Sequence, residues 1–305
     1  MKLDPVLPQV LDGNVLSGRR LATYVKDRVA EAVENLHQHA GFRLCLAVVL
    51  VGDDPASAIY VRNKGRACRK VGIASRSIRL PSDTPQERVL AEIHALNADP
   101  EVDGILVQLP LPEHLDVNTV IDAVDPAKDV DGFHPANLGL LLGRNALLQP
   151  CTPSGVMLML AAAGVPLKGA KALVVGRSLI VGRPMTQLLI RAHATTTCAH
   201  RHTKNLPELV GESDLVVVAT GVPELIKGEW IKPGAVVIDV GISRREDGTL
   251  VGDVEFDAAS QRASAITPVP GGVGPMTITM LLWNTVLAGR TRRGAAGPER
   301  QSPLG

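Results

Sequence analysis

The sequence predicts an α/β fold of two domains, the second of them a Rossmann-like, doubly wound parallel sheet. The chain has 305 residues, more than a single hydrophobic core usually contains. An uninterrupted aliphatic run at 44–51 is typical of a parallel strand covered on both faces. Three similar runs in the second half each end close to a glycine, at Gly176, Gly221 and Gly241. Strands followed by glycine turns indicate a sheet that binds a ligand across its strand ends.

In the first half, helix and strand patterns alternate. Apolar residues at helical spacing predict an amphipathic helix at 19–36. Ser57 is expected to cap the helix that follows the first strand. Thr84 opens a sequence with the form of a capping box, with proline at the first helical position. Further strands are predicted at 73–80 and 104–108.

The boundary between the domains is expected after residue 150, where two prolines bracket a potential helix cap at Thr152. The expected parts are 1–150 for the first domain, 151–275 for the second, 276–290 for an apolar helix that packs back on the first domain and completes it, and 291–305 for a disordered tail. The second domain has strands predicted at 171–175, 195–199, 215–219 and 235–240, and a helix from about Met185.

The composition favours a small-molecule ligand over several other partners. The net charge is +1 and 2% of the residues are aromatic, so neither a nucleic acid nor an anionic membrane surface is indicated. No apolar run reaches the roughly 18 residues of a membrane span, and the N-terminus lacks a targeting pattern. The four cysteines show neither the CxxC spacing of a zinc site nor a disulfide framework. We therefore expect a cytoplasmic protein without a metal centre.

The first candidate site contains Tyr60 and Lys64, which lie four residues apart and so share a helical face. An aromatic ring beside an amine suits a flat, partly aromatic substrate. Gln108 ends a predicted strand, where its amide could bind both the Lys64 amine and a substrate oxygen; a solvent-facing glutamine is the alternative. Asp131 lies in the charged loop 128–135, and its carboxylate could pair with the N–H groups of a heterocycle, although such loops are usually only solvated.

The second candidate site is the turn that contains Gly176, Arg177 and Ser178. Backbone N–H groups in such a turn can bind a phosphate, but the spacing Gly-x-Ser-x-x-x-Gly departs from GxGxxG and is a weak signal by itself. Where an NAD site normally has an acidic residue, this chain has the basic run 200–204. Arg201 together with Arg177 therefore favours NADP through its 2′-phosphate, with a basic surface loop as the alternative.

Six motifs together resemble those of one known family, in the same order and over nearly the whole chain. They are YVRNK at 60–64, GILVQLPLP at 104–112, KDVDGFHP at 128–135, VVGRSLIVGRP at 174–184, IDVGI at 238–242 and PVPGGVGPMT at 268–277. The chain thus resembles the bifunctional methylenetetrahydrofolate dehydrogenase/methenyltetrahydrofolate cyclohydrolase family. The resemblance implies oxidation of 5,10-methylenetetrahydrofolate with NADP, hydrolysis of the methenyl product to 10-formyltetrahydrofolate in the same cleft, and a homodimer.

The resemblance also implies roles for single residues. Lys64 corresponds to the family's lysine, Gln108 to the glutamine that tunes it, and Tyr60 to its stacking tyrosine. Asp131 corresponds to the aspartate that binds the pterin, and the catalytic set is thus Lys64, Gln108, Tyr60 and Asp131. The cofactor contacts implied are Gly176, Arg177, Ser178 and Ile242, with Arg201 as a second contact to the 2′-phosphate at a position where members of the family vary. Folate is expected against Pro270, Gly271 and Gly272, in a stiff proline- and glycine-rich loop.

The chemistry of a tetrahydrofolate is compatible with these residues. An ionised Asp131 could accept bonds from the pterin N–H groups, and Tyr60 could stack on the aminobenzoyl ring. The nicotinamide accepts a hydride without a metal, and a neutral Lys64 amine could help to deprotonate the attacking water. Two other functions stay open. One is a dinucleotide-dependent dehydrogenase of a small amino or hydroxy acid, although no arginine clamp accompanies Lys64; the other is a catalytically silent folate- or dinucleotide-binding protein.

Overall fold

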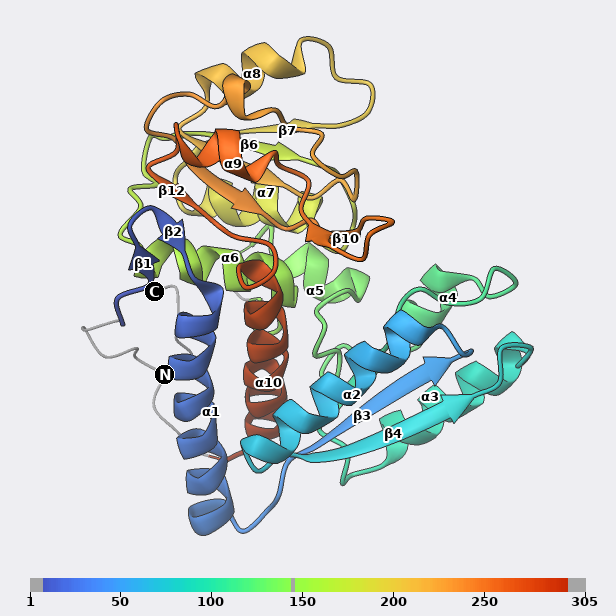
Figure 1. Cartoon of the computed structure of the whole chain (residues 1–305). Coiled ribbons are helices and arrows are strands. Elements are labelled where there is room, and N and C mark those ends of the chain that lie inside the picture. Colours follow the sequence, from blue (N-terminus) through green and yellow to red (C-terminus); the bar gives the residue numbers. More distant parts are fainter. Residues whose placement is uncertain (1–7, 144–145, 296–305) are drawn as a thin grey trace. The chain divides into compact units, whose positions relative to one another are not determined.

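The computed structural model describes residues 8–143 and 146–295, which form two compact units (Figure 1). The unit called here the Lys64 unit comprises 25–143, 146–151 and 278–295. The unit called the Arg177 unit comprises 8–24 and 152–277. Residues 8–24 therefore cluster with the second half of the chain, whereas the sequence division at residue 150 places them in the first domain. Residues 296–305 of the expected tail lie outside the described residues.

The Lys64 unit contains a sheet of three parallel strands in the order β4-β3-β5. Their bounds are Cys45–Val51 for β3, Ala74–Leu80 for β4 and Gly104–Val107 for β5. Six of the seven residues of the central strand β3 are buried, which explains why its sequence is apolar without interruption. The three predicted strands agree with these bounds to within one residue at each end. Gln108 thus follows directly after the carboxyl end of β5.

Two of the helices that belong to this unit, α2 and α5, begin at a proline. The helices of the unit are α2 (Pro55–Lys70), α3 (Gln86–Ala98), α4 (Val117–Asp122) and α5 (Pro135–Leu140), with the later parts of α1 (Gly18–Ala40) and α10 (Val273–Arg292). The predicted cap at Ser57 is wrong: Asp54 caps α2, and its carboxylate accepts the Ser57 N–H at 2.7 Å. Proline at the first helical position makes the preceding residue the cap.

The predicted capping box at Thr84 is also wrong. The cap position of α3 is Pro85, which has extended dihedral angles and no side-chain bond to the helix. The Thr84 hydroxyl instead donates to the Pro81 carbonyl at 2.7 Å. The helix therefore starts one residue later than a Thr84 cap requires, and the threonine stabilises the preceding turn.

The C-terminal part of α10 completes the Lys64 unit. The Asn284 side chain donates to the carbonyls of Val130 and Gln149, each at 2.8 Å. Beyond the helix, the Arg293 guanidinium binds the fully buried Asp103 carboxylate with bonds of 2.8 and 3.1 Å. The predicted packing of the C-terminal helix is thus confirmed. Residue 291, where the tail was expected to begin, lies within this helix.

The Arg177 unit is built on a seven-stranded sheet in the order β1-β2-β12-β9-β8-β6-β7. The bounds are Leu11–Asp12 (β1), Val15–Leu16 (β2), Lys171–Val175 (β6), Thr195–Ala199 (β7), Leu215–Val218 (β8), Val236–Asp239 (β9) and Ala265–Ile266 (β12). All neighbours pair in parallel except β1 with β2. The order reverses between β6 and β8, which is the switch point where open α/β sheets bind ligands.

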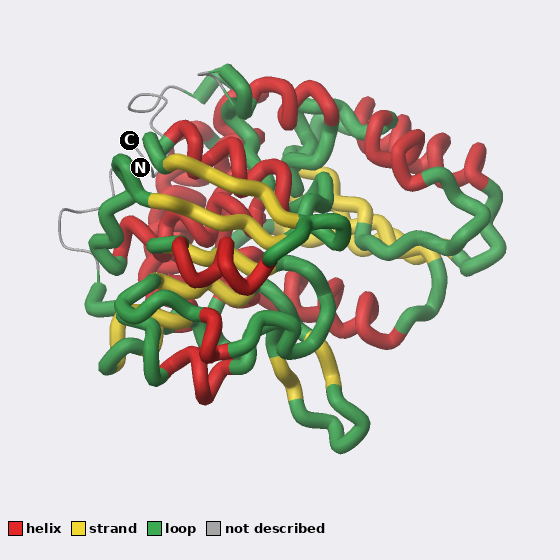
Figure 2. Tube along the Cα trace, turned by 90° about the horizontal axis from the view of Figure 1, so that it is seen from above, coloured by secondary structure: helices red, strands yellow, loops and turns green. Residues whose placement is uncertain are grey.

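Helices cover the strands, as Figure 2 shows in red and yellow. In the Arg177 unit they are α6 (Cys151–Ala162), α7 (Gly182–Arg191), α8 (Leu206–Glu212) and α9 (Phe256–Ser260), with a 3-10 turn η1 (Gly228–Trp230) and a hairpin β10 (Ser243–Arg244) and β11 (Leu250–Val251). Helix α6 already includes Thr152, so the prediction of a helix cap at that residue is wrong. Helix α7 begins at Gly182, three residues before the start predicted at Met185.

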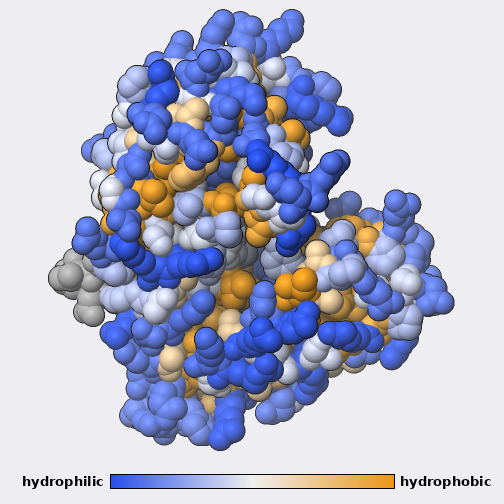
Figure 3. All heavy atoms as spheres, in the orientation of Figure 1, coloured by the Kyte–Doolittle hydropathy of each residue, from blue (hydrophilic) through white to orange (hydrophobic). Residues whose placement is uncertain are grey.

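The surface carries mostly polar side chains with smaller apolar patches between them on the face drawn in Figure 3. Among the helices in the described ranges, none combines the length and the hydropathy needed to cross a bilayer. Buried apolar residues of the described ranges surround the parallel strands of each unit, as in one cluster around β6, β8 and β9 and another around β3 and β5.

Candidate active site

Lys64 and Gln108 contact each other directly in the Lys64 unit. The Lys64 amine donates to Gln108 Oε1 at 3.0 Å, and the Gln108 amide donates in turn to the Leu109 carbonyl at 2.7 Å. The second bond fixes which way the amide points, so its oxygen faces the lysine. Gln108 is 8% exposed, which excludes the alternative of a solvent-facing glutamine. The lysine is therefore held by an uncharged acceptor.

The loop 128–135, which carries Asp131, is anchored by two buried charged residues. Lys128 is 1% exposed, and its amine donates to three carbonyls at the end of α3. These are the carbonyls of Leu96 (2.9 Å), Asn97 (2.7 Å) and Asp99 (2.7 Å). The Asp129 carboxylate accepts bonds from the N–H groups of Gly132 and His134 and from the Asn137 side chain. The solvated loop considered from the sequence is thus excluded, because a buried cation completes a helix end there.

Asp131 is electrostatically linked to Lys64. Removal from water raises the pKa of the Asp131 carboxyl to about 6, the Lys64 charge opposes this rise, and the neighbouring Asp129 charge adds to it. Tyr60 lies on α2 one turn before Lys64, and 42% of its surface is exposed. The Lys64 unit therefore presents an accessible aromatic ring, an amine with a neutral acceptor, and a carboxyl group that titrates close to neutral pH.

The second candidate site occupies the carboxyl ends of strands in the Arg177 unit. Gly176 follows β6 with φ of 119°, and a Cβ atom there would lie 2.2 Å from the Ala219 carbonyl oxygen. Only glycine permits this contact between the loops after β6 and β8. The Ser178 hydroxyl accepts the N–H groups of Val181 and Gly182 at 3.2 and 3.3 Å, at the start of α7. The turn thus has the strand-loop-helix form of a phosphate-binding site.

Arg177 and Arg201 lie at equivalent positions just beyond the neighbouring strands β6 and β7. Val175 of β6 pairs with Ala199 of β7, and each arginine lies two residues beyond its member of this pair. Both side chains are exposed. The Arg201 guanidinium donates to the His202 ring at 3.1 Å. Two cations at the same edge of the sheet can bind a phosphate that lies across these strand ends.

The proline- and glycine-rich loop lies beyond β12. Gly271 has φ of 112°, and its carbonyl accepts the Arg19 N–H at 3.1 Å. The Gly272 N–H donates to the Pro268 carbonyl at 2.8 Å. Pro270 and Gly271 line a cavity of about 290 Å³ that Arg19 also borders. The loop is therefore internally bonded rather than an open linker.

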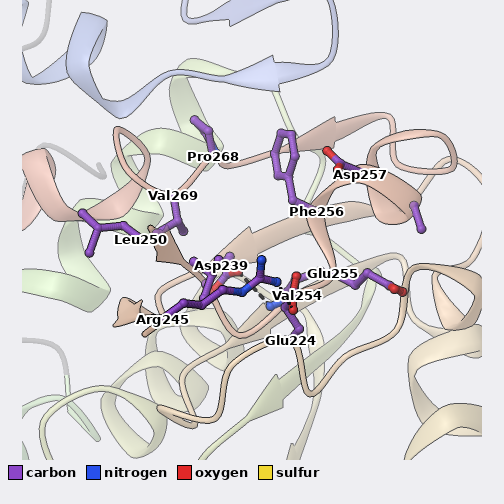
Figure 4. Close-up of a pocket in the computed structure, with 13 residues that line it drawn as sticks. Glu224, Asp239, Arg245, Leu250, Val254, Glu255, Phe256, Asp257, Pro268 and Val269 are labelled. Atoms are coloured by element: carbon purple, nitrogen blue, oxygen red, sulfur yellow. Dashed lines mark hydrogen bonds and ion pairs between the residues drawn. The ribbon is translucent and has the colours of Figure 1, made fainter. Parts of the chain in front are cut away.

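A separate cavity of about 410 Å³ lies in the same unit, between the hairpin β10–β11 and the start of α9 (Figure 4). Asp239, Arg245 and Phe256 are among the side chains in its wall, and Arg245 forms an ion pair with Glu224. None of the site residues predicted from the sequence lines it. Within residues 8–143 and 146–295, no cluster of His, Cys, Asp and Glu could hold a metal ion.

Two family models match the chain over most of its length. "Tetrahydrofolate dehydrogenase/cyclohydrolase, catalytic domain" matches residues 16–131, and the corresponding "NAD(P)-binding domain" matches residues 150–293. The chain belongs to the tetrahydrofolate dehydrogenase/cyclohydrolase family. The family recognised in the sequence motifs is thus confirmed.

Individual relatives agree with this membership. The "Bifunctional protein FolD" of Neisseria gonorrhoeae is 54% identical over 278 residues, which cover 91% of this chain and 98% of the relative. The structure of bifunctional FolD from Campylobacter jejuni has a TM-score of 0.89 and 46% identity, and it covers 91% of this chain and 99% of that one. The Trypanosoma brucei enzyme, solved with NADP and an inhibitor, has a TM-score of 0.88, 40% identity and coverages of 92% and 98%. The predicted α/β fold and the enzyme class are confirmed.

The sequence motifs missed several supporting residues of this family site. Lys128 and Asp129 were treated as part of a charged loop, although they fix the backbone around Asp131. Asp239 and Asp253 received no role, yet both are buried at strand ends of the NAD(P)-binding unit. An aspartate beside a glycine, as in GDV at 252–254, was the available signal, but burial cannot be predicted from such a short motif.

Proposed function

We propose that the two reactions of this bifunctional family take place in this chain around Lys64. The first is oxidation of 5,10-methylenetetrahydrofolate with NADP to the methenyl compound, and the second is hydrolysis of that product to 10-formyltetrahydrofolate. The observation that carries the assignment is the bond from the Lys64 amine to Gln108 Oε1, with the amide fixed by Leu109. A binding protein without catalysis would not require an amine held in this way.

The hydrolysis depends on these side chains more than the hydride transfer does. Water adds to a cationic methenyl carbon and must lose a proton, which a neutral Lys64 amine can accept. Gln108, which carries no charge, orients that amine through its carbonyl oxygen. Asp131 in its ionised form accepts bonds from the pterin amino and ring N–H groups, and the exposed ring of Tyr60 provides a stacking surface.

The strand ends of the Arg177 unit fit NADP. Gly176 lies at the switch point between β6 and β8, where its lack of a side chain allows the two loops to meet. Arg177 and Arg201 supply the positive charge that a 2′-phosphate requires. Ile242, which is 50% exposed just beyond β9, offers an apolar surface for the nicotinamide side. The bound dinucleotide supplies the hydride acceptor, while the protein holds and orients the reactants.

One absorbance experiment tests this function. Purified protein is given 5,10-methylenetetrahydrofolate with NADP, and both NADPH and methenyltetrahydrofolate are followed; hydrolysis of the methenyl compound is then measured without dinucleotide. We expect turnover in both assays. Oxidation of an amino or hydroxy acid in place of the folate would support the alternative dehydrogenase. Binding of folate and NADP without turnover would support a silent binding protein.

The assembly expected is a homodimer. Strand β7 stands at the edge of the seven-stranded sheet, and Ile190 on the adjacent helix α7 is 48% exposed. An unpaired edge beside an apolar side chain is a surface that a second copy can cover. Sedimentation equilibrium should give twice the chain mass, and Ile190→Lys should shift the equilibrium toward monomer.

Folate and NADP are the proposed small-molecule partners, and the cytoplasm is the proposed location.

A further inference from the structure

The loops that follow β8 and β9 are held by one buried carboxylate, that of Asp253. Its Oδ2 atom accepts three hydrogen bonds: from the Thr220 N–H at 2.6 Å, the Thr220 hydroxyl at 2.8 Å and the Gly221 N–H at 2.8 Å. Asp253 is completely buried. Hydrogen bonds to a charged oxygen are stronger than the same number of hydrogen bonds to a neutral acceptor. Asp253 therefore fixes the first residues of the loop after β8.

The other oxygen of Asp253 faces the next loop. Oδ1 is buried and has no hydrogen-bond partner, and a Cβ atom on Gly241 would lie 2.1 Å from it. Gly241 is therefore in van der Waals contact with the carboxylate. The Asp253 side chain thus touches both the loop after β8 and the loop after β9.

Asp239 holds Asp253 in place. It ends β9, and its carboxylate accepts the N–H groups of Gly241 at 2.9 Å, Asp253 at 3.0 Å and Val254 at 2.9 Å. A Cβ atom on Gly252 would lie 1.9 Å from Asp239 Oδ2, so this contact also requires glycine. Burial raises the pKa of Asp239 to about 6, against the effect of its backbone hydrogen bonds. The two carboxylates thus tie the segment 252–254 to the loop after β9.

These loops lie where the dinucleotide is expected. Val218 of β8 pairs with Val175 of β6 on one side and with Asp239 of β9 on the other, so the three strands end level. Beyond these ends, Val222 and Ile242 expose 49% and 50% of their surfaces. Each of the two loops that Asp253 touches therefore carries one exposed apolar side chain, which a flat ring of the dinucleotide can contact. Asp239 also lines the cavity of Figure 4, but neither Val222 nor Ile242 does.

We propose that Asp253 is a positioning residue for the dinucleotide, which acts by holding Thr220–Gly221 and Gly241–Ile242 at the spacing that the nicotinamide side requires. This inference rests on the proposed function, because it assumes that the ligand of the strand ends is NADP. It assigns to Asp253 no contact with the substrate or the cofactor. The consequence is selective. Loss of the carboxylate should impair hydride transfer and spare cyclohydrolase activity, because the proposed proton acceptor of the hydrolysis, Lys64, belongs to the other unit.

The test compares Asp253→Ala, Asp253→Asn and the exposed control Asp257→Asn. For each, the Kd for NADP is measured by calorimetry, dehydrogenase kcat and KM are measured, and cyclohydrolase activity is assayed on the methenyl compound alone. Asp253→Ala should raise the Kd for NADP at least about tenfold, equivalent to about one lost charge-assisted hydrogen bond. Cyclohydrolase turnover should stay within about twofold. Asp253→Asn keeps an acceptor oxygen and should recover part of the affinity.

A second variant guards against unfolding of Asp253→Ala. Gly241→Ala retains the carboxylate but places a methyl group against it, so it should displace the loop after β9 and weaken NADP binding with the same selectivity. Gly211→Ala, whose Cβ would be an ordinary 3.5 Å from the nearest atom, is the matched control. The inference is wrong if neither variant separates NADP affinity from cyclohydrolase turnover in folded protein. A wild-type chain that fails to bind NADP would instead overturn the proposed function.

Discussion

The two candidate sites are built in opposite ways. In the Lys64 unit, the proposed chemistry depends on side chains from a helix, a strand end and a loop, and Lys64 bonds directly to Gln108. In the Arg177 unit, the strand ends supply backbone and shape, and buried carboxylates beneath them set the spacing of the loops. Proton transfer depends on the identity of a side chain, whereas holding a cofactor depends on where the backbone runs. Substitutions should therefore affect the two units differently.

The largest effect is expected at Lys64. Lys64→Met removes the proton acceptor but keeps the length of the side chain, so cyclohydrolase kcat should fall by at least about 100-fold, with a smaller loss of dehydrogenase activity. Methenyltetrahydrofolate hydrolysis, followed by absorbance, measures the effect, with Lys70→Met at the exposed end of α2 as control. Substantial hydrolysis by Lys64→Met in folded protein would remove Lys64 from the mechanism.

The contrasting substitutions remove the two arginines at the strand ends of the Arg177 unit. Arg177→Ala and Arg201→Ala each remove a charge proposed to bind the 2′-phosphate, so the KM for NADP should rise about 10- to 100-fold. The KM for NAD and the rate of methenyl hydrolysis should change little. Steady-state kinetics with both dinucleotides measure this. Equal losses with NAD and NADP would contradict a 2′-phosphate site.

If Asp131 binds the pterin as proposed, we expect folate binding to depend on pH. Its pKa of about 6 means that the carboxyl becomes protonated, and loses acceptor capacity, as the pH falls below that value. The KM for 5,10-methylenetetrahydrofolate should therefore rise about tenfold for each pH unit well below 6. The measurement is a KM profile between pH 5 and 8. Asp131→Asn should have a high KM with no such dependence; an unchanged wild-type profile would argue against binding by the ionised form.

The smallest effect concerns stability. The folded-state pKa of Asp131 is above the reference value of about 3.9, so stability is greatest below that value and falls as the pH rises toward 6. Asp131→Asn should therefore stabilise the protein at pH 7 by up to about 2 kcal/mol while impairing folate binding. Urea unfolding at pH 5 and pH 7 tests this, with exposed Asp83→Asn as control. A destabilised Asn variant would show that the charge is needed for folding.

Much of the fold could be predicted because burial on both faces leaves a clear record in a strand. Strand β6 matches its predicted bounds and β3 differs by one residue, since their runs of aliphatic residues coincide with their buried lengths. Strand β7 also matches its predicted bounds, although only Ala199 of its residues is buried. Short strands such as β1, β2 and β12, each of two residues, leave no comparable pattern. The helix caps were misplaced because Asp54 and Ser57 are both good caps, and the position of Pro55 decided between them.

Whether a site residue could be predicted depends on the kind of contact it makes and not on its unit. Lys64, Gln108 and Asp131 could be proposed from their chemical types and motifs, and the structure adds the contact between the first two. The roles of Lys128 and Asp253 could not, because each depends on carbonyl or N–H groups far away in the sequence. Lys128 contacts the end of α3, about thirty residues earlier, and Asp253 contacts Thr220, 33 residues earlier.

The order in which the chain leaves the ribosome has a consequence for both units. Val15 of β2 pairs with Ile266 of β12, and the Val130 carbonyl is satisfied by Asn284. Neither unit can acquire all its native contacts until nearly the whole chain has been synthesised. Nascent chains that stop before residue 266 should therefore remain open to proteases in both units, so that a truncated product is removed before it can bind either ligand.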